Sequence, residues 1–80
     1  MFVTGYRQSY RRDSTGQRIL GWWLYGLSNI EGSIGLMPVR TFIASKDYAL
    51  TYPPIKSLIG HKVVVLKDHL DRLASFRVVD

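Results

Sequence analysis

The chain of 80 residues contains no cysteine, and this absence excludes both a disulfide framework and a thiolate metal site. A chain this short buries only about 60% of the surface that its unfolded form exposes. We therefore expect its stability to come from efficient barrel packing or from oligomerisation. The lack of cysteine also fits a reducing compartment, and the sequence favours a cytoplasmic protein.

Long apolar stretches are missing as well. No window approaches the roughly 18 to 20 apolar residues that a membrane-spanning helix needs, and no charged N-terminal stretch leads into an apolar segment. The sequence therefore predicts a soluble protein with no membrane partner.

Acidic residues are few, since six Asp and Glu stand against eleven Lys and Arg and leave a net charge of +5. Such an excess favours a polyanionic partner, although net charge can also serve solubility alone. The placement of the cations along the chain must decide between these interpretations.

Residue sets that support catalysis are also absent. His61 and His69 are not paired with carboxylates at a metal-ligand spacing, and no glycine-rich loop ends in Lys-Ser or Lys-Thr. Asp13, Ser14 and Thr15 are explained by turn chemistry rather than by a nucleophile and its base. The sequence predicts a protein that is not an enzyme and that binds no metal or cofactor.

The first 27 residues predict a β-hairpin. Residues Phe2 to Arg12 alternate as in a strand, with Tyr6 and Tyr10 on one face and Arg7 and Arg11 on the other. The polar segment 13–17 predicts the hairpin loop, and Arg18 to Leu27 predicts the returning strand.

The remainder of the chain predicts three further strands. Their expected ranges, with a turn at 28–33 before the first of them, are Ile34 to Ala44, Lys62 to Lys67 and Leu73 to Val79. Pro38 cannot donate a hydrogen bond and argues for an edge strand or a bulge. Asp68 to Phe76 could also be a helix, because Leu70, Leu73 and Ala74 have helical spacing.

Between the third and fourth strands lies a long connection. Ser45 is expected to cap a short helical turn through residue 49, and Pro53-Pro54 is expected to force an extended crossing. Five short strands with one long link after the third predict an all-β (mainly β) fold in one domain, residues 1–80. Its architecture is a small five-stranded barrel, either OB-fold or SH3-like.

Two adjacent tryptophans, Trp22 and Trp23, stand in the second predicted strand. Neighbouring strand residues point to opposite faces, so one indole is expected in the core and the other on the opposite face. An exposed indole needs a ligand, a partner or a second copy to cover it. Gly21 and Gly26 bracket the pair, and they leave room for the strand to bend and for a flat ligand or second chain to approach.

Cations and aromatic rings alternate along the first hairpin. Cations can follow phosphates, and flat rings can stack on bases, so this interleaving favours single-stranded nucleic acid as the ligand. The candidate nucleic-acid-binding residues are Tyr6, Arg7, Tyr10, Arg11, Arg12, Arg18, Trp22, Trp23, Tyr25 and Arg40. Arg11 and Arg12 are expected to be exposed beside the loop.

The order of these features resembles a known family. A tyrosine-bearing first strand, the polar loop Ser14 to Arg18, a proline-containing crossing and a final strand pair are similar to the small OB-fold single-stranded DNA-binding proteins of filamentous phages and related mobile elements. The resemblance implies a homodimer that coats single strands of DNA with little sequence preference. The adjacent tryptophans and the long segment 45–54 depart from that family's pattern.

Two other functions stay open on the sequence. One is an SH3-like protein-interaction adaptor whose Trp and Tyr side chains form an aromatic groove for a peptide, with a proline-rich peptide as one candidate. The other is a structural component of a phage or mobile element that self-associates through the tryptophan strand, which has no need of the arginines.

Overall fold

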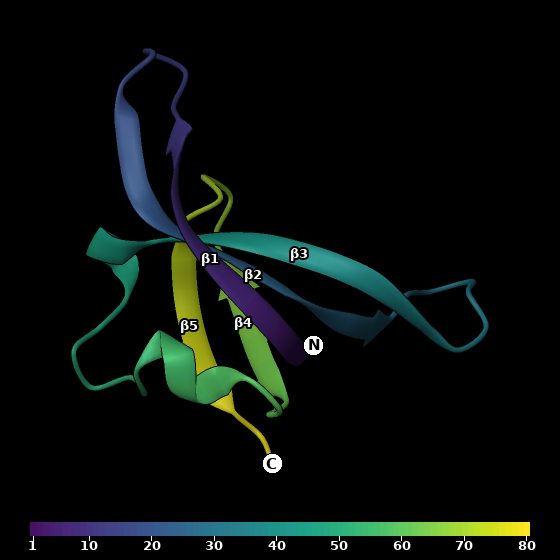
Figure 1. The fold of residues 1–80 in the computed structure, drawn as a ribbon. Coiled ribbons are helices and arrows are strands. Elements are labelled where there is room, and N and C mark those ends of the chain that lie inside the picture. The colour runs from purple at the N-terminus through teal and green to yellow at the C-terminus, as the bar shows by residue number, and fades with distance from the viewer.

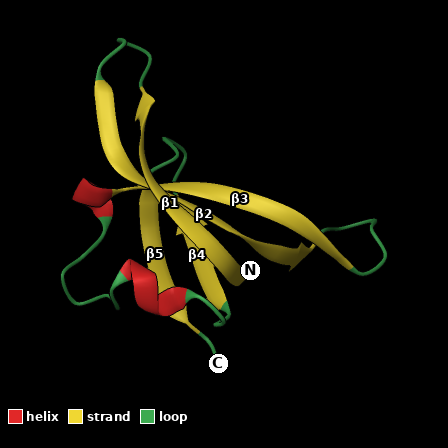
Figure 2. Ribbon diagram, in the orientation of Figure 1, coloured by secondary structure: helices red, strands yellow, loops and turns green.

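The computed structural model describes all 80 residues and is mainly β, as the sequence predicts (Figures 1 and 2). Two antiparallel sheets are present, one of three strands in the order β1-β2-β3 and one of two strands, β4-β5. The strands are β1 (Phe2–Arg12), β2 (Arg18–Asn29), β3 (Leu36–Ala44), β4 (Val63–Lys67) and β5 (Leu73–Val78). The long connection after β3 holds two 3₁₀ turns, η1 (Ser45–Asp47) and η2 (Ile55–Leu58).

The first hairpin is confirmed, with β1 at its predicted bounds and β2 two residues longer than predicted. Asp13 shapes the loop between them. Its carboxylate oxygen Oδ1 accepts hydrogen bonds from the Thr15 hydroxyl at 2.6 Å and from the backbone N–H groups of Thr15 and Gln17 at 2.9 and 3.0 Å. An acidic side chain that accepts hydrogen bonds from N–H groups a few residues later commonly closes a turn of this kind.

The third strand begins two residues later than predicted. Gly35 has a positive φ of 82°, which interrupts the extended backbone, and the Ile34 side chain is fully exposed in the turn before it. Pro38 lies in β3, which is an edge strand of the three-stranded sheet. The edge position that the proline predicted is therefore confirmed.

The connection differs from its prediction in two respects. A short helical turn does follow β3, but Ser45 does not cap it: the Ser45 hydroxyl donates instead to the carbonyl oxygen of Leu20 at 3.2 Å. The proline pair is extended at Pro54, with φ −55° and ψ 141°, but it leads directly into η2, which the sequence did not predict. Two residues of η2, Ile55 and Leu58, are buried.

The last two strands form a hairpin, so the helical alternative for Asp68 to Phe76 is wrong. Strand β4 starts one residue later than predicted and β5 ends one residue earlier. The Asp68 carboxylate closes the turn by accepting from the N–H groups of Leu70 and Arg72 at 2.9 and 3.0 Å. The hydrogen bonds with which Asp68 closes the turn favour a hairpin more strongly than the spacing of Leu70 and Leu73 favours a helix.

The two sheets are joined where the first residues of the chain run beside residues 60–63. The N–H of Val3 donates to the His61 carbonyl at 3.0 Å, and the N–H of Gly60 donates to the Val3 carbonyl at 2.8 Å. The N–H of Val63 donates to the Met1 carbonyl at 2.8 Å, and the Met1 amino group donates back to the Val63 carbonyl at 3.0 Å. We call these contacts the N-terminal seam.

The core lies between the two sheets and the connection. It contains one cluster with members from β1, β2, β3, η2, β4 and β5: Val3, Leu24, Ile43, Ile55, Leu58, Val63 and Phe76. Because each strand contributes only one residue to this cluster, every element depends on its neighbours for burial.

Closure of the five strands into a barrel stays a prediction. Strand pairing gives two separate sheets joined by the single bridge Phe2–Lys62. A groove of about 500 Å³ separates β3 from β4 and is lined by Val39, Thr41, Val63 and Val65.

The helical segments, η1 and η2, have three and four residues. Neither is long and apolar enough to cross a membrane.

Gly21 and Gly26 both allow a close approach, but what approaches is the chain's own backbone. A Cβ on Gly21 would clash with the Ile43 carbonyl oxygen, and one on Gly26 would clash with the Phe2 carbonyl oxygen. The expectation that these glycines admit a flat ligand or a second chain is therefore wrong. They let β2 lie tightly between its two neighbours.

This packing predicts that Gly21→Ala destabilises the protein, by about 1–3 kcal/mol or more, because the new methyl group meets backbone that cannot move aside. Gly5→Ala is the matched control in the same sheet, since a Cβ there meets nothing within 4 Å. Chemical denaturation followed by circular dichroism measures both. Equal stability of the two variants would contradict the close approach at Gly21.

Candidate nucleic-acid interface

The residues predicted to bind nucleic acid divide between the two faces of the three-stranded sheet. The strand register places Gln8 opposite Trp22 and Arg7 opposite Trp23, so alternate residues sort onto opposite faces. One face carries Tyr6, Tyr10, Arg12, Arg18 and Trp22, and the other carries Arg7, Arg11, Trp23, Tyr25 and Arg40. The predicted separation of Tyr6 and Tyr10 from Arg7 and Arg11 is confirmed.

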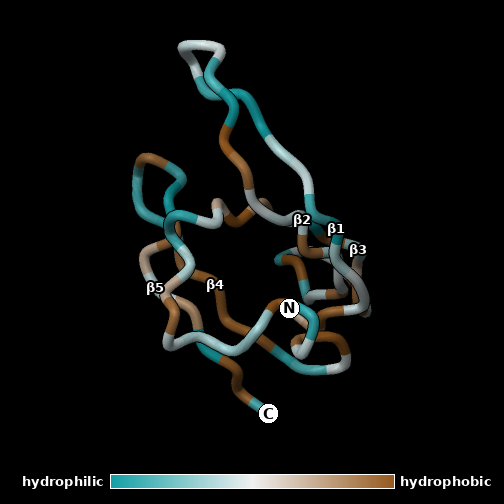
Figure 3. Tube along the Cα trace, turned by 60° about the vertical axis from the view of Figure 1, so that its left-hand side comes forward, coloured by the Kyte–Doolittle hydropathy of each residue, from teal (hydrophilic) through white to brown (hydrophobic).

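The far end of the β1–β2 hairpin projects from the body and is largely hydrophilic (Figures 1 and 3). Tyr10 lies on this projection, and the residue is 41% exposed. The Arg18 guanidinium lies 4.2 Å from the centre of the Tyr10 ring, and the Arg12 guanidinium lies 5.9 Å from it. We call these three residues the tyrosine clamp.

Neither arginine of the tyrosine clamp pairs with a carboxylate. The Arg12 guanidinium donates to the backbone carbonyl of Gly16 at 2.8 Å, which holds it against the loop. The nearby Asp13 carboxylate is engaged by the loop itself, and its hydrogen bond from the Thr15 hydroxyl lowers its pKa. The clamp therefore offers two guanidinium groups without an ion-pair partner beside an exposed tyrosine.

The opposite face carries the second tryptophan. The Trp23 ring packs edge-on against Phe42 with centroids 5.3 Å apart, and the Arg40 guanidinium lies 4.7 Å from the indole centre. Trp23 is consequently half-buried. The chain's own side chains supply the cover that the sequence assigned to a ligand or partner.

The first tryptophan packs against the core, as one of the pair was expected to do. Trp22 is half-buried and meets the Tyr48 ring edge-on with centroids 5.7 Å apart. Tyr48 contacts Tyr52 and Phe76 in the same manner, at 5.1 and 5.3 Å. Burial raises the pKa of the Tyr48 phenol. Reasoning from the sequence missed Tyr48 and Tyr52 because they lie in the connection, outside any strand alternation.

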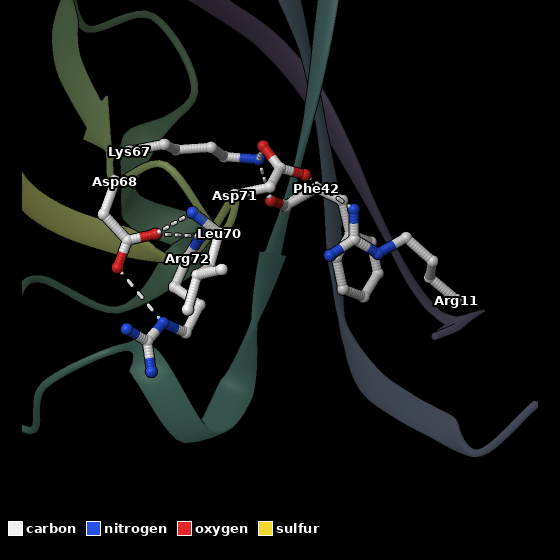
Figure 4. A network of polar contacts seen from close by, with 7 residues as sticks. All are labelled: Arg11, Phe42, Lys67, Asp68, Leu70, Asp71 and Arg72. Atoms are coloured by element: carbon white, nitrogen blue, oxygen red, sulfur yellow. Dashed lines mark hydrogen bonds and ion pairs between the residues drawn. The ribbon is translucent and has the colours of Figure 1, made fainter. Parts of the chain in front are cut away.

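Arg11 is not the exposed cation that the sequence predicted. Its guanidinium donates to the Asp71 carboxylate at 2.8 Å and lies 5.1 Å from the centre of the buried Phe42 ring (Figure 4). Lys67 joins the same group, because its ammonium donates to the Phe42 carbonyl at 2.7 Å and lies 3.5 Å from Asp71. This network ties β1 and β3 to the β4–β5 turn, so Arg11 has a structural partner.

Most other cations lack such a partner. Only Arg11, Lys67 and Arg72 form ion pairs with carboxylates, whereas the remaining eight Lys and Arg side chains do not: Arg7, Arg12, Arg18, Arg40, Lys46, Lys56, Lys62 and Arg77. His61 lies 3.5 Å from the Asp80 carboxylate. No cluster of three His, Asp or Glu side chains is present.

No protein-family model, curated protein or solved structure matches this chain.

The Arg11–Asp71 contact predicts a pH dependence. The hydrogen bond from Arg11 is the largest of the effects that hold the Asp71 pKa below its ordinary value of 3.8. A carboxyl whose pKa is depressed by folding stabilises the protein above its unfolded pKa, and this contribution is lost as the pH falls through the folded pKa. We therefore expect an NMR titration to give Asp71 a pKa below 3.8, and Arg11→Met to raise it.

Asp68 provides an internal control for that titration. Its pKa is lowered chiefly by the backbone N–H of Arg72, so Arg11→Met is expected to leave it unchanged. If Asp71 titrates at its ordinary value in the wild-type protein, the ion pair seen in Figure 4 does not persist in solution.

Proposed function

We propose that this protein is a non-enzymatic single-stranded nucleic-acid-binding protein and that DNA is its ligand. The observation that carries the proposal is the tyrosine clamp, in which the guanidinium groups of Arg12 and Arg18 lie 5.9 and 4.2 Å from the centre of the exposed Tyr10 ring. A flat ring can stack on a base of any sequence, and the neighbouring cations can bind phosphates of the same strand. Because the hairpin projects from the body, a nucleic-acid strand can reach all three side chains.

The distribution of charge supports the same proposal. Arg7 is exposed on β1, and Arg40 is exposed on β3 over the Trp23 ring, and neither has a carboxylate partner. A nucleic-acid strand that passes from the tyrosine clamp across the edge of β1 would meet Arg7 and Arg40 on the second face of the sheet. Trp22 and Arg11 are left out of this interface because core packing and the Asp71 pair engage them.

The proposal includes a fold and a family. Two antiparallel sheets joined at the N-terminal seam are compatible with a small barrel of the OB-fold or SH3-like kind, and OB-folds are a recurrent scaffold for single-strand binding. The proposed family is that of the filamentous-phage and mobile-element single-stranded DNA-binding proteins, and the proposed assembly is a homodimer.

The test is a titration with oligo-dT at several salt concentrations, read by fluorescence anisotropy of a labelled oligonucleotide. Tyr10→Ala is expected to weaken binding by about 1–3 kcal/mol, the usual value of one stacked base. The double variant Arg12→Ala/Arg18→Ala is expected to reduce the slope of log K against log salt by about 1.4, since each phosphate contact on a single strand contributes about 0.7.

The matched control is Lys62→Ala/Arg77→Ala, which removes the same charge from exposed, unpaired positions outside the first hairpin. It is expected to retain most of the wild-type slope. Affinity that does not depend on salt, or equal losses in the two double variants, would remove the support for a site at the tyrosine clamp.

A further inference from the structure

A second concave surface lies between β1 and the connection that follows β3. This groove has a volume of about 540 Å³, which falls within the range of ligand sites. Its lining includes four aromatic rings, two prolines and one cation: Tyr6, Trp22, Tyr48, Tyr52, Pro53, Pro54 and Lys56. We call it the aromatic groove.

The walls of the aromatic groove are held in place without a ligand. Tyr48 makes edge-on contacts with both Trp22 and Tyr52, and its hydroxyl donates to the Pro53 carbonyl at 2.5 Å. Tyr52 also packs against the buried Phe76 ring at 5.5 Å. A surface that is already ordered loses little side-chain entropy when a ligand binds.

Three donors on the aromatic side chains of the aromatic groove are unused. The hydroxyls of Tyr6 and Tyr52 and the indole N–H of Trp22 make no hydrogen bond within the chain, and none of them is enclosed. A ligand that suits this surface must bring flat or apolar side chains together with acceptors at short intervals. A polyproline II segment does so, because its carbonyl groups have no internal hydrogen bonds and its backbone is already extended.

We propose that the aromatic groove binds a proline-rich peptide segment of a partner protein, in the polyproline II conformation. Aromatic-lined grooves bind such segments because the preformed helix costs little conformational entropy on binding. Tyr6 and Trp22 contribute from the sheet, and Tyr52 contributes from the connection, so the peptide lies across both.

The charge of the aromatic groove favours a peptide over a nucleic acid. Lys56 is the only charged residue among those that line it, whereas a nucleic-acid strand brings one phosphate with every nucleotide. A mostly neutral peptide needs no further cations. Lys56 favours an acidic residue next to the prolines.

This site goes beyond the proposed nucleic-acid function and uses none of the tyrosine clamp. Tyr6 and Tyr10 share a face of β1, so the aromatic groove and the tyrosine clamp are neighbours along one strand. The protein can hold an oligonucleotide on its projecting hairpin while a partner's peptide occupies the body.

The experiment measures anisotropy of a fluorescein-labelled decaproline peptide that ends in two glutamates, with a Gly-Ser peptide carrying the same two glutamates as the reference ligand. The variant Tyr6→Phe/Tyr52→Phe removes two donors but keeps both rings and their packing. We expect it to bind decaproline more weakly, by about two- to ten-fold for each hydroxyl. Tyr25→Phe, on the other face of the sheet, is the matched control and is expected to bind as the wild type does.

Each outcome bears on the proposal. Preference for decaproline over the Gly-Ser peptide, lost in Tyr6→Phe/Tyr52→Phe and kept in Tyr25→Phe, supports it. Absence of that preference, or binding that does not respond to the two hydroxyls, overturns it. A fall in oligo-dT affinity in Tyr6→Phe/Tyr52→Phe would also overturn it, since the aromatic groove would then belong to the nucleic-acid interface.

Discussion

The N-terminal seam is the constraint on which the rest of the structure depends. Its four hydrogen bonds bring Met1 and Val3 against residues 60–63 and so place the β1-β2-β3 sheet over the β4-β5 hairpin. A two-stranded hairpin is marginal by itself in water, and η2 has no core of its own. Only when the seam forms can Val3, Leu58 and Val63 meet in one cluster. Because the buried apolar residues are concentrated near the seam, the far end of the first hairpin can carry charged side chains.

The Arg11–Asp71 pair is a second tie between the same two sheets, at the other end of β1. It differs from the seam in kind. An ion pair that water still reaches adds little to stability, whereas the backbone bonds of the seam accompany the burial of apolar side chains. The Arg11 network therefore serves to position the β4–β5 turn against β3, and the seam supplies the joint that lets the core form.

Local patterns in the sequence were sufficient for most of the fold. Strand alternation fixed both ends of β1, and Asp13 and Asp68 marked their turns, because each of these features acts within a few residues. The start of β3 was missed because Gly35 adopts a positive φ that alternation cannot reveal. Turn η2 was missed because Ile55 and Leu58 form a helical face only through contacts with distant strands.

The candidate site was less predictable for the same reason. Alternation correctly separated Tyr10 from Arg11, and it indicated that the two tryptophans lie on opposite faces. It could not show that Asp71, sixty residues away, would engage Arg11, or that Tyr48 and Tyr52 would line a groove with Tyr6. The pattern also suggested that Gly21 and Gly26 leave room for a ligand. The structure shows that neighbouring backbone fills that space.

The outer edge of β3 affects how a second molecule can contact this protein. An open strand edge ordinarily invites another strand to extend the sheet. Here Pro38 has no N–H to offer, and the Lys67 ammonium already occupies the Phe42 carbonyl. Another molecule that approaches the outer edge of β3 would therefore meet it chiefly through side chains, and this edge resists extension into a continuous sheet.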